Sequence, residues 1–245
     1  MKILSLTVRS TLYIAALSFC LECAKAAMKP TAFVPPMLEV STTSASPLDS
    51  IQNFFKNTFS APSKKGEKNN ADDDLRLKLK MELLTECKAT NSKNMSEQRT
   101  KIESIMKELS SLSPVAETAA SPLLQKPWLM FWTTEKEINF FNDWKISDGN
   151  ITQIISDGSV LQNNIPFTRG GSLSVEGTLS LSSDEQGQQS LRTYFKFTNA
   201  VLDVGKWGRF ELPPVGEGWF DTVYLDDDLR VDINSRNDIL ICSPL

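Results

Sequence analysis

An alternation of apolar and polar residues through the second half of the chain most constrains its fold. From Pro127 to Cys242, short alternating runs are separated by turn residues at intervals of roughly 8–12 residues. A period of two is that of a β-strand with one buried face. Such spacing is typical of sandwiches and barrels rather than of α/β folds. We therefore predict roughly eight to ten short antiparallel strands over about 127–242, closed into a barrel.

Individual runs make this prediction concrete. Leucine and valine alternate with serine and glutamate over 173–182, and Gly177 at the midpoint favours a bend. Phe195 and Phe197 alternate with polar residues in the next run. Asp148-Gly149 and Asp157-Gly158 are dipeptides typical of hairpin turns.

The segment before the strands has a helical period instead. Apolar residues recur at steps of three and four in two stretches: Leu75, Leu79, Leu83, Cys87, and Ile102, Ile105, Met106, Leu109, Leu112. Asn91 and Pro114 end the stretches. We predict an α-helical hairpin over about 73–113 whose apolar side covers another part of the fold.

The first 70 residues differ in charge from the rest. They hold 8 Lys/Arg and 4 Asp/Glu, whereas residues 71–245 hold 18 and 26. Lys2 and Arg9 precede an apolar stretch that ends near Ala24-Lys25-Ala26, which predicts a signal peptide over 1–32. A buried N-terminal helix is the alternative. Residues 33–70 are hydroxyl-rich, cationic and poor in acids, which is typical of a disordered transit peptide; a linker in a secreted protein has a similar composition.

Several functional classes are excluded by composition. The chain has no histidine, which rules out Ser-His-Asp systems and HExxH zinc sites. A net charge of −4 argues against nucleic-acid binding. Gly170-Gly171 and 205–208 match no phosphate-binding loop, and no metal-binding cysteine spacing remains after residue 32. We predict no catalytic residue, no metal, no cofactor and no transmembrane span in the mature chain.

Two groups of side chains remain as candidates. An acidic group comprises Asp221, Asp226, Asp227, Asp228 and Asp232. We interpret it as a solvated turn with one carboxylate paired to Arg230; a hydrolase with paired carboxylates is the alternative. Aromatic residues are frequent among the strands, and Trp132, Phe195 and Phe197 are candidates for lining an apolar cavity. For any single ring, ordinary core packing is the better explanation, and only the rings taken together favour a cavity.

Four blocks of the chain resemble the plastid lipid-associated protein family, also called plastid fibrillins. They are 83–91, 102–114, 124–134 and 218–231. The last block is specific, and its signature residues are Asp221, Thr222, Tyr224, Leu225, Asp226, Asp228 and Leu229. Departures occur at Ser92-Lys93, at Pro127 before Trp128, and at 232–234. The run Ala32-Phe33 is similar to the junction of the bipartite presequences of algae with secondary plastids.

The resemblance implies a mainly β domain over 71–245, a lipocalin-like antiparallel β-barrel preceded by the helical hairpin. It implies a non-catalytic protein that binds or stabilises a prenylquinone, carotenoid or fatty acid at the thylakoid or plastoglobule. Trp128 and Arg230 would close one end of the barrel. The presequence implies a secondary plastid reached through the ER. A scaffold or enzyme-accessory protein with a filled barrel and no ligand is the alternative.

Overall fold

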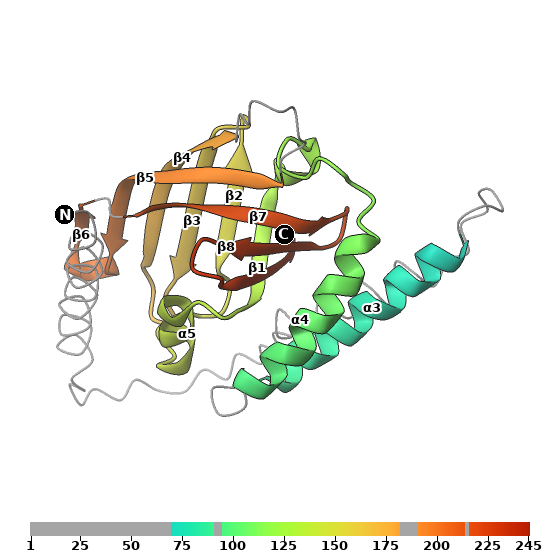
Figure 1. The fold of residues 1–245 in the computed structure, drawn as a ribbon. Coiled ribbons are helices and arrows are strands. Elements are labelled where there is room, and N and C mark those ends of the chain that lie inside the picture. The colour runs from blue at the N-terminus through green and yellow to red at the C-terminus, as the bar shows by residue number, and fades with distance from the viewer. Residues whose placement is uncertain (1–69, 91–94, 182–190, 214–215) are drawn as a thin grey trace, which may run out of the picture.

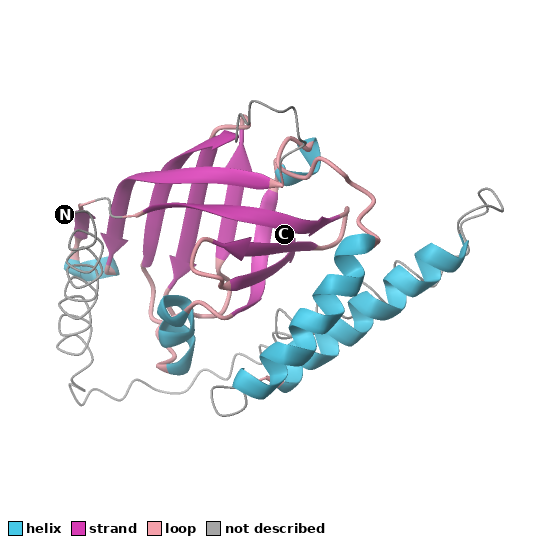
Figure 2. Ribbon diagram, in the orientation of Figure 1, coloured by secondary structure: helices cyan, strands magenta, loops and turns pink. Residues whose placement is uncertain are grey.

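The computed structural model describes residues 70–90, 95–181, 191–213 and 216–245. Two long helices are followed by nine strands, with one further helix and two 3₁₀ turns between them (Figures 1 and 2). The helices are α3 (Asn70–Ala89), α4 (Met95–Ser111) and α5 (Lys136–Asp143), and the 3₁₀ turns are η1 (Pro122–Leu124) and η2 (Gly205–Trp207). The strands are β1 (Pro127–Thr133), β2 (Thr152–Ser156), β3 (Val160–Pro166), β4 (Ser172–Leu181), β5 (Arg192–Asp203), β6 (Arg209–Leu212), β7 (Glu217–Leu225), β8 (Arg230–Asn234) and β9 (Ile239–Pro244).

The nine strands form one antiparallel, ring-like sheet. Their order is β4-β3-β2-β1-β9-β8-β7-β5-β6, and β4 also pairs with β5 along ten positions from Ser172 to Leu181. This pairing joins the two sides of the sheet, so that eight strands form a ring and β6 extends the far end of β5. The prediction of a mainly β fold with short antiparallel strands is confirmed. The predicted signal and transit segments, 1–32 and 33–70, lie outside the described residues except for Asn70.

Alternate residues of the strands contribute to two large apolar clusters. The interior cluster, inside the ring, includes Trp128, Met130, Ile155, Leu161, Leu173, Leu179, Phe220, Leu225 and Cys242. The helix-facing cluster lies between the outer face of the sheet and the hairpin, and includes Leu79, Leu83, Ile102, Leu109, Trp132, Tyr224, Val231 and Ile241. The apolar side predicted for the hairpin therefore covers β1 and β7–β9, as Figure 1 shows.

Two β-bulges move large aromatic side chains from one cluster to the other. The β1–β9 ladder shifts register between Met130 and Trp132, and the β7–β8 ladder shifts between Thr222 and Tyr224. An extra residue in a strand reverses the side on which the following side chains lie. Trp132 and Tyr224 consequently pack against the hairpin.

A third register shift lies between Glu176 and Gly177, where the sequence favours a bend. A Cβ at Gly177 would lie 2.7 Å from the carbonyl oxygen of Lys196, so only glycine permits this approach of β4 to β5. None of the described helices is both long and apolar enough to cross a bilayer.

Candidate functional site: the interior of the ring

The three candidate ligand-lining residues lie on two faces of the sheet. Phe195 and Phe197 are half-buried beside the interior cluster, with ring centroids 5.0 Å apart. Trp132 belongs to the helix-facing cluster because of the β1 bulge. The structure thus brings two of the three together inside the ring and separates the third from them.

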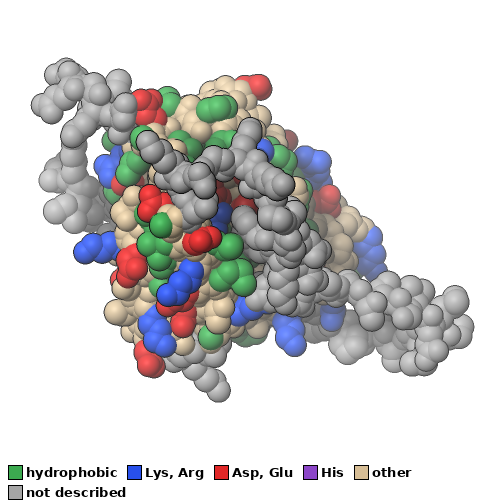
Figure 3. All heavy atoms as spheres, turned by 90° about the vertical axis from the view of Figure 1, so that its right-hand side faces the viewer, with side chains coloured by type: hydrophobic (Ala, Val, Ile, Leu, Met, Phe, Trp, Pro, Cys, Tyr) green, Lys and Arg blue, Asp and Glu red, His purple; other side chains and the backbone are tan. Residues whose placement is uncertain are grey.

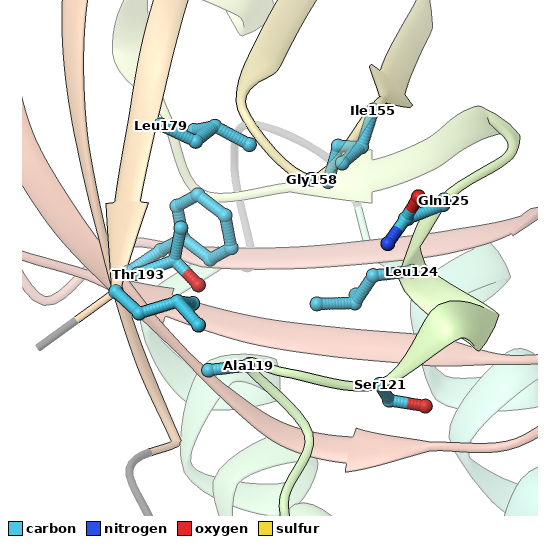
Figure 4. A pocket seen from close by; sticks show the side chains of 10 residues that line it. Ala119, Ser121, Leu124, Gln125, Ile155, Gly158, Leu179 and Thr193 are labelled. Atoms are coloured by element: carbon cyan, nitrogen blue, oxygen red, sulfur yellow. The ribbon is translucent and has the colours of Figure 1, made fainter.

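A small cavity lies at the end of the ring that η1 covers (Figure 4). It has a volume of about 20 Å³, and its walls include Leu124, Ile155, Leu179 and Phe220. Thr193 also lines it, and its buried hydroxyl has no hydrogen-bond partner among the described residues. A space of this size takes about one water-sized group, whereas pockets for small-molecule ligands measure roughly 300–1,000 Å³.

A buried ion pair crosses the interior beside this cavity. Arg230 is fully buried, and its Nε and Nη2 atoms lie 2.9 and 2.7 Å from Oδ2 of Asp232, which is 2% exposed. Nη2 also donates to the side-chain oxygen of Gln153 on β2. The guanidinium therefore reaches from β8, past β9 and β1, to β2.

Aromatic rings enclose this guanidinium. Its carbon lies 5.4 Å from the centroid of Trp128 and 5.8 Å from that of Phe220. The indole N–H of Trp128 donates to the Leu124 carbonyl oxygen at 3.0 Å, which ties η1 to β1. The predicted contact between Trp128 and Arg230 is therefore present, at the end of the ring that η1 covers.

Burial and the charge of Asp232 act on Arg230 in opposite directions. Burial alone lowers the pKa of Arg230, but the adjacent Asp232 carboxylate outweighs it and the pKa is raised. The Thr222 hydroxyl donates to the second oxygen of Asp232 at 2.8 Å. Nη1 of Arg230 has no hydrogen-bond partner within the part of the chain that the structure describes. A charge held in this way is suited to a structural role rather than to proton transfer.

Four of the five acidic residues predicted as a group pair with three different cations, whereas Asp227 is exposed and only its carbonyl oxygen accepts a hydrogen bond from the ammonium of Lys126, at 2.9 Å. Asp232 pairs with Arg230 inside the ring, and Asp221 pairs with Arg192 at its surface, at 2.8 Å. Asp226 and Asp228 lie near the ammonium of Lys80 on α3, which is 4% exposed. Among the described residues these carboxylates do not converge on a common cleft, and no group of acids or cysteines there forms a metal site. The geometry therefore does not support the paired-carboxylate hydrolase.

Lys80 joins the hairpin to the connection between β7 and β8. Oδ1 of Asp226 accepts the backbone N–H groups of Asp228 and Leu229, both at 2.8 Å, and this shapes the turn. Oδ2 accepts the hydroxyl of Tyr224 at 2.5 Å. Burial, followed by the charge of Asp226, raises the pKa of Tyr224, so the hydroxyl stays protonated. Burial also raises the pKa of Asp228, against the opposing effect of Lys80.

The remaining signature residues are buried side chains of the same region. Leu225 and Leu229 are completely buried, Leu225 in the interior cluster and Leu229 in the helix-facing cluster. Thr222 is also completely buried, and its carbonyl oxygen accepts the hydroxyl of Thr118 at 2.6 Å. The signature thus positions the turn that meets α3.

Sequence reasoning missed Lys80, Gln153 and α5. Lys80 follows Leu79 in an apolar helical stripe, and Gln153 occupies an inward position between Ile151 and Ile155. A polar residue at an apolar position of the period is the signal that would have found both. Helix α5 is too short for a clear helical period.

Two comparisons match the sequence of this chain to known proteins. A relative of 34% identity over 123 residues is named "probable plastid-lipid-associated protein 11, chloroplastic" and comes from Arabidopsis thaliana. The match covers 48% of this chain and 55% of the relative, so the chain spans about half the length of that protein. No solved structure matches the chain. Residues 77–213, more than half of the chain, match the family model PAP_fibrillin. This protein therefore belongs to the PAP/fibrillin family, the plastid lipid-associated proteins.

Proposed function

We propose that this chain is a non-catalytic plastid lipid-associated protein that binds or stabilises apolar small molecules at the thylakoid or plastoglobule. The ring would act as a lipocalin-like barrel. Its ligand would be a prenylquinone, a carotenoid or a fatty acid. The chloroplast location given in the name of the Arabidopsis relative supports a plastid. The route through the ER to a secondary plastid rests on residues 1–70 of the sequence.

The observation that carries this proposal is the composition of the ring interior. Strands on all sides contribute aliphatic and aromatic side chains to it, and Phe195 and Phe197 are two of the half-buried residues that pack against it. Arg230 and Asp232 inside the ring are paired with each other, so most of the remaining interior surface offers apolar contact. An apolar ligand would have to enter beside the two phenylalanines by displacing side chains, since the cavity measures about 20 Å³.

The small cavity favours a second candidate function. A ring already filled by its own side chains would serve as a scaffold or enzyme-accessory protein, with its outer surface as the working part. The two candidates differ in whether an apolar molecule accompanies the purified protein.

Extraction of lipids from the purified full chain, followed by mass spectrometry, tests the proposal. We expect a quinone, carotenoid or acyl lipid at a fixed ratio to protein, reduced in Phe197→Ala. Tyr194→Ala is the matched control, because Tyr194 is on the same strand with its side chain 40% exposed. A lipid-free protein that also binds no added quinone or fatty acid would favour the scaffold.

A further inference from the structure

Three inward side chains of β5 form a row along the wall of the ring. Thr193, Phe195 and Phe197 alternate in the strand, so their side chains lie on one face. That face is the inner one, since Thr193 lines the cavity and both phenylalanines pack against the interior cluster. Four residues of a strand span about 13 Å. The row therefore offers two aromatic rings at one end and a hydroxyl at the other.

Glycines of the neighbouring segments make room for these rings close to the sheet. A Cβ at Gly177 on β4 would lie 3.1 Å from Cδ1 of Phe197, and a Cβ at Gly216, just before β7, would lie 2.9 Å from Cδ2. The two edges of this ring thus lie against backbone on both sides, which holds the ring near the wall. Gly218 has the same relation to Phe195, at 3.1 Å from Cζ. Both rings are half-buried, so each keeps surface that an apolar molecule can cover.

The hydroxyl of Thr193, at the other end of the row, is buried and unpaired. The residue is 2% exposed, and its side-chain oxygen has no hydrogen-bond partner among the described residues. Figure 4 shows this oxygen beside the cavity, facing the side chain of Leu124. Because the cavity holds about one water-sized group, a single oxygen atom of a ligand fits it. An unpaired hydroxyl in an apolar site is unfavourable, and a bound oxygen would relieve that cost.

The surroundings of this hydroxyl favour an uncharged oxygen. None of the described residues that line the cavity is charged, whereas acidic and basic side chains are mixed over the outer surface on the hairpin side (Figure 3). The guanidinium that crosses the interior, that of Arg230, already pairs with Asp232 at 2.7 Å, and the pair is neutral in sum. A ligand carboxylate would therefore enter the interior without a cation of its own, which is costly in an apolar site. A carbonyl or hydroxyl oxygen needs only a hydrogen-bond partner.

We propose that the ligand of the ring is an apolar molecule with an uncharged oxygen at one end, and that this oxygen forms a hydrogen bond with Thr193. The inference rests on the proposed lipid-binding function and narrows the class of its ligand. The apolar body of the ligand lies along β5 on Phe195 and Phe197, and the oxygen fills the cavity near η1. A quinone carbonyl or an alcohol has this chemistry, whereas a fatty acid that is ionised at neutral pH does not.

Binding of a plastoquinone analogue with a decyl chain to the full chain tests the site, with quenching of tryptophan fluorescence as the measurement. Thr193→Val keeps the shape of the side chain and removes the hydroxyl. It should weaken quinone binding by about two- to tenfold, the range for one hydrogen bond. Thr193→Ser retains a hydroxyl and should restore most of the affinity. Thr178→Val is the matched control, because Thr178 is exposed on β4, and it should bind the quinone as the unchanged chain does.

Competition between two probes of equal chain length tests the charge of the ligand. 1-Dodecanol and dodecanoate are each used to displace the quinone at about pH 8, where the carboxyl group is ionised. We expect dodecanol to displace the quinone at a concentration roughly tenfold lower than dodecanoate, because burying the carboxylate is costly. Thr193→Val should weaken the binding of dodecanol and leave that of dodecanoate unchanged. Circular dichroism checks that each variant is folded, and Thr193→Ala replaces Thr193→Val if the latter is not.

The outcomes separate this inference from the proposed function. Quinone binding that Thr193→Val leaves unchanged refutes the site, and the lipid-binding function stands. If dodecanoate displaces the quinone as well as dodecanol does, the uncharged class of ligand is refuted. A chain that carries lipid on purification but binds neither the quinone nor the alcohol also overturns the inference alone. Failure of probe binding together with lipid-free purification refutes both.

Discussion

Removal of the guanidinium from the ring interior should destabilise this protein more than most single substitutions. Arg230→Met keeps much of the side-chain volume but leaves the carboxylate of Asp232, 2% exposed, without its cation. The Thr222 hydroxyl remains as a hydrogen-bond donor to it. Breaking a buried ion pair by removing one partner costs about 3–5 kcal/mol, because the remaining charge is uncompensated.

The expected loss corresponds to a fall in Tm of about 6–20 °C, since a domain of this size loses roughly 2–4 °C per kcal/mol. Arg230→Met/Asp232→Leu should recover most of the loss, because replacing both members of a buried pair by apolar residues is often neutral or stabilising. Arg192→Met is the matched control. Its pair with Asp221 is 36% and 25% exposed, so the loss should be below about 1 kcal/mol.

Urea unfolding followed by circular dichroism measures all four proteins at one pH. A loss below about 1 kcal/mol in Arg230→Met would show that the interior tolerates a lone carboxylate, contrary to the reasoning. An equal loss in the single and double variants would show that the cost comes from packing against Trp128 and Phe220 instead of from charge.

Three further predictions concern other parts of the fold. Lys80→Met should lower the free energy of unfolding in urea by about 1–3 kcal/mol, because it removes the cation from two carboxylates of the β7–β8 turn. Lys78 is exposed on the same helix, so Lys78→Met should stay within about 0.5 kcal/mol of the unchanged chain. Gly171→Ala should lower the Tm more than Gly170→Ala: both have φ near +90°, but only at Gly171 does a Cβ meet backbone, at 2.2 Å. Burial raises the pKa of Cys242 to about 12, so below that pH the folded protein keeps this thiol protonated. Cys242 should react with a thiol reagent only after unfolding, and peptide mass spectrometry that finds Cys242 itself modified promptly in the native protein would contradict its burial.

The repeated apolar patterns of the sequence were enough to predict the fold class. The ion pairs formed by single polar residues could not be predicted in this way. Alternation specifies strands, and the four-residue steps from Leu75 to Cys87 specify a helix packed on one side. Leu79, Leu83 and Cys87 make the observed contact, whereas Leu75 is 43% exposed. The pairing of β1 with β9 joins segments from opposite ends of the strand region, and alternation does not say which distant strands pair. The cation for Asp226 and Asp228 could not be predicted from local sequence, because Lys80 is distant in the chain and reaches the turn only through the packing of α3.

The two β-bulges are the main reason why the side chains inside the ring could not be predicted from the sequence. Trp128, Met130 and Trp132 alternate in the sequence, which places all three on one face of an ideal strand. The extra residue in β1 sends Trp132 to the hairpin while Trp128 stays inside, and the bulge in β7 does the same to Tyr224. A bulge is defined by the register of the neighbouring strand, so one strand's sequence does not reveal it. The aromatic residues therefore have different structural roles: Trp132 and Tyr224 pack against the hairpin, and Trp128 and Phe220 enclose the guanidinium of Arg230.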